Sequence, residues 1–123
     1  MKKIFTLFAI LTITPTLTVA QDVTQVTADE LASTWSSNQL RADMAYGNRP
    51  LHITGIVDEI SDVLGDYYVA LKARGTILGI YVYVKNSALN DVAALSSGEK
   101  VTMYCENFTE NFGFECYNGH LVK

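Results

Sequence analysis

The spacing of apolar positions changes along this chain, and the first long periodic stretch is helical. Its apolar side chains, with one asparagine among them, recur at steps of three and four residues, as on one face of a helix: Leu31, Trp35, Asn38, Ala42 and Tyr46. Thr27 and Glu30 form a capping box ahead of this face. Gly47 and Pro50 are typical of a helix end. The pattern predicts one helix between Thr27 and Gly47.

After Pro50 the period changes to two, which is typical of strands with one buried face. The alternation predicts three strands, over Leu51–Ile60, Tyr67–Lys72 and Ile77–Val84. Leu64–Asp66 and Ala73–Thr76 form the turns between them. Gly55 lies inside the first strand, where a bulge or a sharp bend lets a small barrel curl.

The last third of the chain is predicted to hold a short helix and a hairpin. These elements cover Ser87–Leu95, Val101–Glu106 and Phe112–Tyr117. In a regular hairpin Cys105 stands opposite Cys116, because both are equally far from its centre. Tyr104 then faces Tyr117 on the opposite surface.

The predicted order is therefore a helix, three strands, a short helix and two strands. Five antiparallel strands with a helix between the third and the fourth are the arrangement of the OB-fold, a small, partly open barrel. We therefore expect a mainly β domain over residues 27–123 in which an N-terminal helix precedes a five-stranded OB-fold barrel. An open sandwich is the alternative. We expect Trp35 to plug the barrel and Asn38 to hydrogen-bond the loop that follows.

Several runs of residues keep the order found in one known family. They are Ala28–Leu31, Trp35, Asn38, Arg41–Asp43, Tyr46–Gly47, Ile53–Gly55, Tyr68–Leu71 and Leu95–Val101. With these runs the segment Thr27–Cys116 resembles the tRNA_anti-like family of exported bacterial OB-fold proteins. The resemblance implies the OB-fold and, by analogy with anticodon-binding domains, binding of nucleic acid. The family often has tyrosine where this chain has Trp35.

The first twenty residues are typical of a secretory signal peptide. Lys2 and Lys3 precede the apolar run Ile4–Ile13, and the small residue Ala20 ends the segment. A run of about ten apolar residues is shorter than the roughly twenty that a membrane-spanning helix needs. We expect cleavage after residue 20, a flexible leader over residues 21–26, and a periplasmic or secreted protein without a membrane span. A retained membrane anchor is the alternative. Lipid attachment is not expected, because no cysteine stands at the predicted cut.

Export places both cysteines of the chain, Cys105 and Cys116, in an oxidising compartment, where a disulfide is predicted. A metal site is the alternative, although two thiols make a poor zinc ligand set without a third ligand. The mature part has seven basic side chains against 13 acidic ones, a net charge of −6. Because phosphate binding needs clustered Lys and Arg, this charge disfavours nucleic acid. Cationic partners, neutral glycans and proteins remain.

Groups that carry out catalysis or hold cofactors are scarce in this sequence. His52 and His120 are its two histidines, and no nucleophile elbow, phosphate-binding motif or zinc motif occurs. We therefore predict a protein without enzymatic activity, cofactor or metal. Four carboxylates crowd the first turn of the barrel: Asp58, Glu59, Asp62 and Asp66. A calcium site is the alternative to a solvated surface here, but the spacing differs from the twelve-residue calcium loop.

Tyrosines on the predicted strands are the candidate ligand-binding residues. They are Tyr68, Tyr81, Tyr83, Tyr104 and Tyr117. OB-folds bind ligands across their second and third strands, where aromatic rings stack on sugars or bases or anchor a protein. The alternative is that the rings only cover the barrel. We expect an exported binding module for a protein or glycan. Single-stranded nucleic-acid binding and an envelope-stress or inhibitor role are the alternatives.

Overall fold

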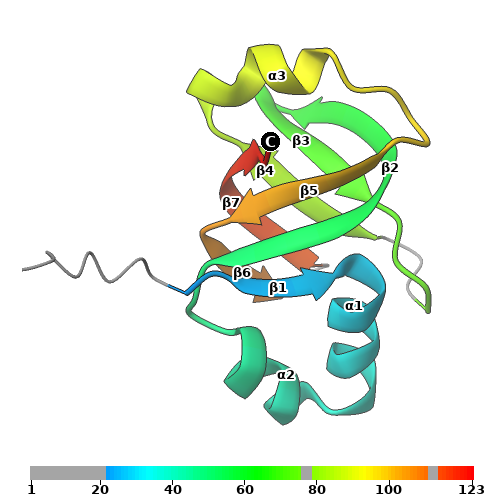
Figure 1. Ribbon diagram of the computed structural model, residues 1–123, viewed down its shortest axis with the longest axis vertical. Helices are drawn as coiled ribbons and strands as arrows, with labels where there is room; N and C mark the ends of the chain where they lie inside the picture. Colours follow the sequence, from blue (N-terminus) through cyan, green and yellow to red (C-terminus); the bar gives the residue numbers. More distant parts are fainter. Residues whose placement is uncertain (1–21, 76–78, 111–113) are drawn as a thin grey trace, which may run out of the picture.

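The computed structural model describes residues 22–75, 79–110 and 114–123 (Figure 1). The predicted signal peptide, the start of the predicted third strand and the tip of the predicted hairpin lie outside these residues. The elements are β1 (Thr24–Thr27), α1 (Ala28–Ser37), α2 (Gln39–Tyr46), β2 (Leu51–Val63), β3 (Asp66–Leu71), β4 (Ile80–Val84), η1 (Asn86–Ala88), α3 (Leu89–Ala93), β5 (Lys100–Cys105), β6 (Asn107–Glu110) and β7 (Phe114–Leu121).

Five of these strands form a closed barrel, which confirms the predicted OB-fold. Their order is β2–β3–β4–β7–β5, and β5 pairs back with β2. Strands β4 and β7 run parallel, and the other neighbouring pairs of the barrel are antiparallel. Helices α1 and α2 lie at one end of the barrel and α3 at the other (Figure 1).

Apolar side chains from the barrel strands and from α1 fill the interior. The fully buried ones include Leu31, Leu51, Ile53, Leu71, Ile80, Val82 and Met103. Each such side chain stabilises the fold by roughly 1.5–3 kcal/mol relative to an exposed one. The period-two alternation places the tyrosines of β4 on the outer side, because Ile80 and Val82 point inward.

Trp35 lies at the edge of the core, so its predicted place inside the barrel is wrong. Leu31 supplies the largest fully buried side chain of α1 instead. The Trp35 ring is half-buried and meets Phe108 and Phe114 edge-on, with ring centroids 5.4 and 5.9 Å apart. Its Nε1–H donates to Oε2 of Glu110 at 2.6 Å. An indole N–H needs such a partner, and the edge of the core provides one.

Two predictions near the N-terminus are also wrong. Thr24–Thr27 is not a loose leader, because it pairs in parallel with Leu51–Thr54 as strand β1. The single predicted helix is two helices, since Asn38 has an extended backbone between α1 and α2. Oδ1 of Asn38 accepts from the backbone N–H of Arg41 at 3.0 Å and so caps α2. Thr27 caps α1 as predicted, accepting from the N–H of Glu30.

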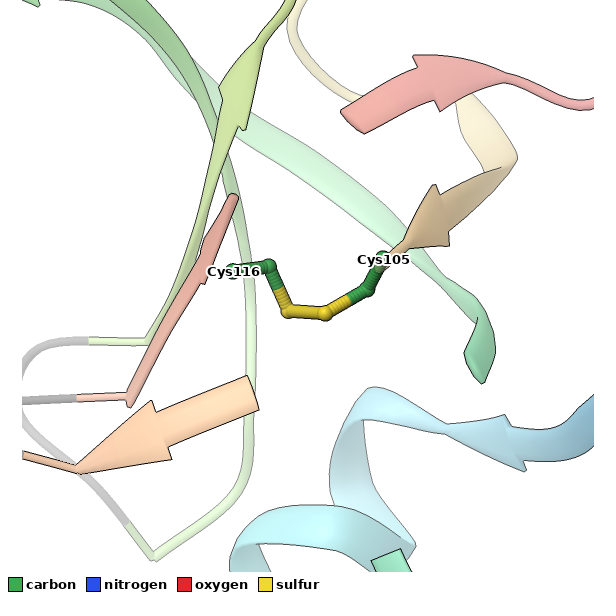
Figure 2. Close-up of a disulfide and its surroundings, with 2 residues drawn as sticks. All are labelled: Cys105 and Cys116. Atoms are coloured by element: carbon green, nitrogen blue, oxygen red, sulfur yellow. A yellow bond between two sulfur atoms is a disulfide. The ribbon is translucent and has the colours of Figure 1, made fainter. Parts of the chain in front are cut away.

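The predicted disulfide between Cys105 and Cys116 is confirmed, but the hairpin around it is different. The two Cα atoms are 5.3 Å apart, and the bridge joins the end of β5 to β7 (Figure 2). In the register of the strands, however, Phe108 of β6 stands opposite Cys116. Tyr104 stands opposite His120 rather than Tyr117. The assumption of one regular hairpin failed because the chain leaves β5 at Cys105 and starts a new strand, β6.

Gly55 marks a close approach of chain segments, and the bulge expected there lies further along β2. The register with β3 shifts between Val57 and Glu59. A Cβ added at Gly55 would lie 3.0 Å from Cβ of Ala28 and 3.3 Å from Cβ of Leu71. Glycine at this position therefore lets the start of α1 pack directly on the barrel.

Candidate functional site: a tyrosine face on the barrel

Four of the five predicted tyrosines meet on the outer side of β3, β4 and β7. We define them as the tyrosine face: Tyr68, Tyr81, Tyr83 and Tyr117. Tyr68 meets Tyr81 and Tyr83 edge-on, with ring centroids 5.0 and 5.7 Å apart. Tyr83 stacks on Tyr117 with an interplanar angle of 8° and a centroid distance of 5.5 Å. Strands β3 and β4 are the second and third strands of the barrel, across which OB-folds bind ligands.

A hollow of about 480 Å³ lies at one edge of the tyrosine face, beside the β2–β3 turn. It is lined by Val63, Leu64, Asp66, Tyr83, Val84, Glu115, Tyr117 and Asn118. Leu64 is 100% exposed and Val63 is 49% exposed, so the rim of this hollow presents apolar surface to solvent. The hollow therefore combines aromatic rings, exposed aliphatic groups and two carboxylates.

Carboxylates act on three phenol groups of the tyrosine face, those of Tyr81, Tyr83 and Tyr117. Burial raises the pKa of Tyr83 above its ordinary value, and the charges of Glu115 and Asp66 raise it further. The hydrogen bond from the Tyr117 hydroxyl to Oε2 of Glu115, 2.5 Å long, is the main cause that raises the pKa of Tyr117.

Tyr81 is affected in the same direction by a second pair of acids. Burial is the largest cause that raises its pKa, and the charges of Glu59 and Asp58 add to it. The phenols of Tyr81, Tyr83 and Tyr117 thus lie near negative charges, which favour their neutral form.

Tyr104, the fifth predicted tyrosine, lies away from this face. Its ring stacks on His120 of β7 with a centroid distance of 4.7 Å and meets His52 of β2 edge-on at 6.0 Å. Nδ1 of His52 is 2.9 Å from Nε2 of Gln25 in β1. This second aromatic row runs across β2, β5 and β7, so the five tyrosines do not form one surface.

The described residues show no gathered metal ligands. Among residues 22–75, 79–110 and 114–123, no group of three or more His, Cys, Asp or Glu side chains could hold a metal ion. Over the same residues, no helix has both the length and the hydropathy to cross a membrane.

Sequence reasoning missed Leu64 and Glu115 as residues of the site. The sequence analysis places Leu64 in a turn and gives it no other role. The signal for such a role is the residue type, because a two-residue hairpin turn of this kind needs a positive φ, which leucine rarely adopts. Glu115 is two residues from Tyr117 on β7, so strand alternation would have placed both on one face. The sequence analysis did not predict the pairing of β7 with β4, which brings Glu115 and Tyr117 next to the tyrosines of β4.

The sequence model of the tRNA_anti-like family matches residues 11–109. The chain belongs to the tRNA_anti-like family. A comparison with curated protein sequences finds no significant match. Among solved structures, this tRNA_anti-like chain is similar to a Klebsiella pneumoniae protein named a "putative nucleic acid-binding lipoprotein", with 18% identity and a TM-score of 0.58. That similarity covers 82% of this chain and 92% of the other.

A second similar structure is the Stn1–Ten1 complex of S. pombe, with 14% identity and a TM-score of 0.50. The similarity covers 65% of this tRNA_anti-like chain and 62% of the matched one. At these identities both structures support the fold. Together with the family, they support a binding module built on an OB-fold barrel.

Proposed function

We propose that this protein is an exported, non-catalytic binding module that takes a protein or glycan ligand on its tyrosine face. The observation that carries this proposal is the contact of four tyrosines from three strands at the surface where OB-folds bind. Half-buried rings held by their neighbours lose little conformational freedom when a ligand docks. The disulfide supports export, because disulfides persist in oxidising compartments.

The test compares a face variant with a variant of the same residue type elsewhere. Tyr83→Ala with Tyr117→Ala removes the stacked pair, and Tyr104→Ala is the control on the other aromatic row. The probes are a basic peptide, a neutral oligosaccharide and a single-stranded oligonucleotide, followed by amide chemical shifts in NMR. We expect the basic peptide or the oligosaccharide to shift the amides of β3, β4 and β7 and to lose binding only in the face variant, whereas binding of the oligonucleotide alone would favour the second candidate below. The proposal is wrong if neither the peptide nor the oligosaccharide perturbs these amides, or if binding survives in the face variant.

Single-stranded nucleic acid is the second candidate ligand. The family and the name of the Klebsiella protein support it, and stacked aromatic rings are the platform on which bases bind. The carboxylates near Tyr81 and Tyr83 oppose it, because they repel phosphate. This candidate predicts oligonucleotide binding that weakens steeply with added salt, and no binding at low ionic strength excludes it.

A further inference from the structure

The hollow beside the β2–β3 turn carries an inference about the class of ligand, which rests on the proposed function. We propose that the tyrosine face and this hollow dock a protein segment that presents arginine or lysine side chains next to an apolar residue. The inference goes beyond the family, whose name points to RNA.

The charges of the hollow select a cation. Asp66 and Glu115 both line it, and within the described parts of the chain neither belongs to an ion pair. The ion pairs in the described parts of the chain are Arg74–Asp29 and Lys123–Asp91, and none of these four residues lines the hollow. A guanidinium or ammonium group in the hollow would meet both carboxylates, whereas a phosphate would meet their repulsion.

The aromatic rings favour the same ligand. A cation over the face of a tyrosine ring is attracted by the ring quadrupole, and arginine also stacks on aromatic rings through its planar guanidinium. Tyr117 is 39% exposed and is stacked with Tyr83, so an aromatic surface stands beside the carboxylate of Glu115. Tyr117 also holds Glu115 in place through its hydroxyl group.

The exposed aliphatic groups favour a protein over a small cation or a glycan. Leu64 and Val63 project at the rim of the hollow, and Leu64 is in contact with solvent over its whole surface. Burying Leu64 requires an apolar side chain of the partner close to its charged one. A segment of a basic protein offers both groups, and the formal net charge of −4 steers such a partner toward the chain.

The experiment uses a hexa-arginine peptide that also carries one leucine, with a hexa-glutamate peptide, a neutral oligosaccharide and an oligothymidine as comparison probes. Binding is measured by calorimetry, and the site is located by amide chemical shifts. The test variant is Asp66→Asn with Glu115→Gln, which keeps side-chain shape and removes two charges. The matched control, Asp22→Asn with Glu30→Gln, removes two exposed charges near the N-terminus.

We expect the arginine peptide to shift the amides around Tyr83 and Tyr117. Its affinity should fall about tenfold in the test variant, as for two exposed charge pairs, and stay within about twofold of the wild-type value in the control. Equal losses in both variants, or equal binding by the hexa-glutamate peptide, overturn the inference. If only the oligosaccharide shifts these amides, this inference fails and the proposed function stands. If only the oligothymidine shifts them, both fail and single-stranded nucleic acid is the ligand. If no probe shifts them, both fail.

Discussion

At the scale of single residues, Leu64 combines two features that a folded protein rarely tolerates together. Its φ of 53° lies in the left-handed region, and Gly65 follows with a φ of 90°, so the two form a tight hairpin turn. For a leucine this backbone costs roughly 1–2 kcal/mol relative to the right-handed form. The side chain recovers nothing by burial, because it is fully exposed. A contact with a ligand would explain why this residue stands in the turn.

Leu64→Asn should therefore stabilise the protein and weaken ligand binding at the same time. Asparagine tolerates the left-handed conformation, so we expect the free energy of unfolding to rise by about 1 kcal/mol. Urea denaturation measures this change. The control is Val63→Asn, at a neighbouring strand position of ordinary backbone, where no such gain is expected. An unchanged or lower stability of Leu64→Asn would contradict the strain assigned to this turn.

At the scale of elements, local patterns predicted the start of α1, the three middle strands and the direction of their side chains. Capping and alternation depend on residues close in sequence, so they can be identified without the fold. Asn38 was different. Its spacing fits the helical face, but its side chain competes for backbone hydrogen bonds and interrupts the helix. The pairing of Tyr104 with His120 could not be predicted from the sequence either, because it depends on which strands become neighbours.

The tyrosine face follows the same division. Alternation predicted that Tyr81 and Tyr83 point away from the core, and they do. Contact of Tyr83 with Tyr117 depends on the parallel pairing of β4 with β7, which joins distant parts of the sequence. Strand alternation thus identified the tyrosines as candidates, but which of them come together, and that Leu64 and Glu115 lie beside them, depends on the pairing of strands in the barrel.

The disulfide is the element-scale feature with the clearest expected effect. It closes a loop between residues 11 positions apart, which contains β6. Loop-closure entropy predicts that Cys105→Ala with Cys116→Ala lowers the free energy of unfolding by about 3 kcal/mol. Thermal or urea unfolding measures the loss.

Reductant provides the control for this prediction. It should destabilise the wild-type protein by a similar amount and leave the alanine variant unchanged. Equal stability of oxidised and reduced wild-type protein would show that the bridge adds nothing to the fold.

At the scale of the whole molecule, the predicted signal peptide ends before the first strand of the described fold begins. Strand β1 begins at Thr24, so cleavage after Ala20 leaves its pairing with Leu51–Thr54 complete. Such a cleavage would also remove two lysines and change the formal net charge from −4 to −6. A chain cut after Ala20 would therefore keep every described element and be more acidic than the full chain.

We expect protein made in a Gram-negative host to be recovered from the periplasm as a chain that begins at Gln21 with its disulfide formed. Mass spectrometry of the periplasmic fraction measures both the cut and the bridge. Lys2→Glu with Lys3→Glu reverses the charge of the signal's first region and should leave the protein uncleaved and its cysteines reduced. Full-length protein of 13.6 kDa recovered with the membranes would favour the retained anchor instead. Because β1 is whole in both forms, the cleaved and uncleaved chains should unfold at the same denaturant concentration once the uncleaved chain has been oxidised so that both carry the disulfide. This comparison separates the role of residues 1–20 in export from any role in folding.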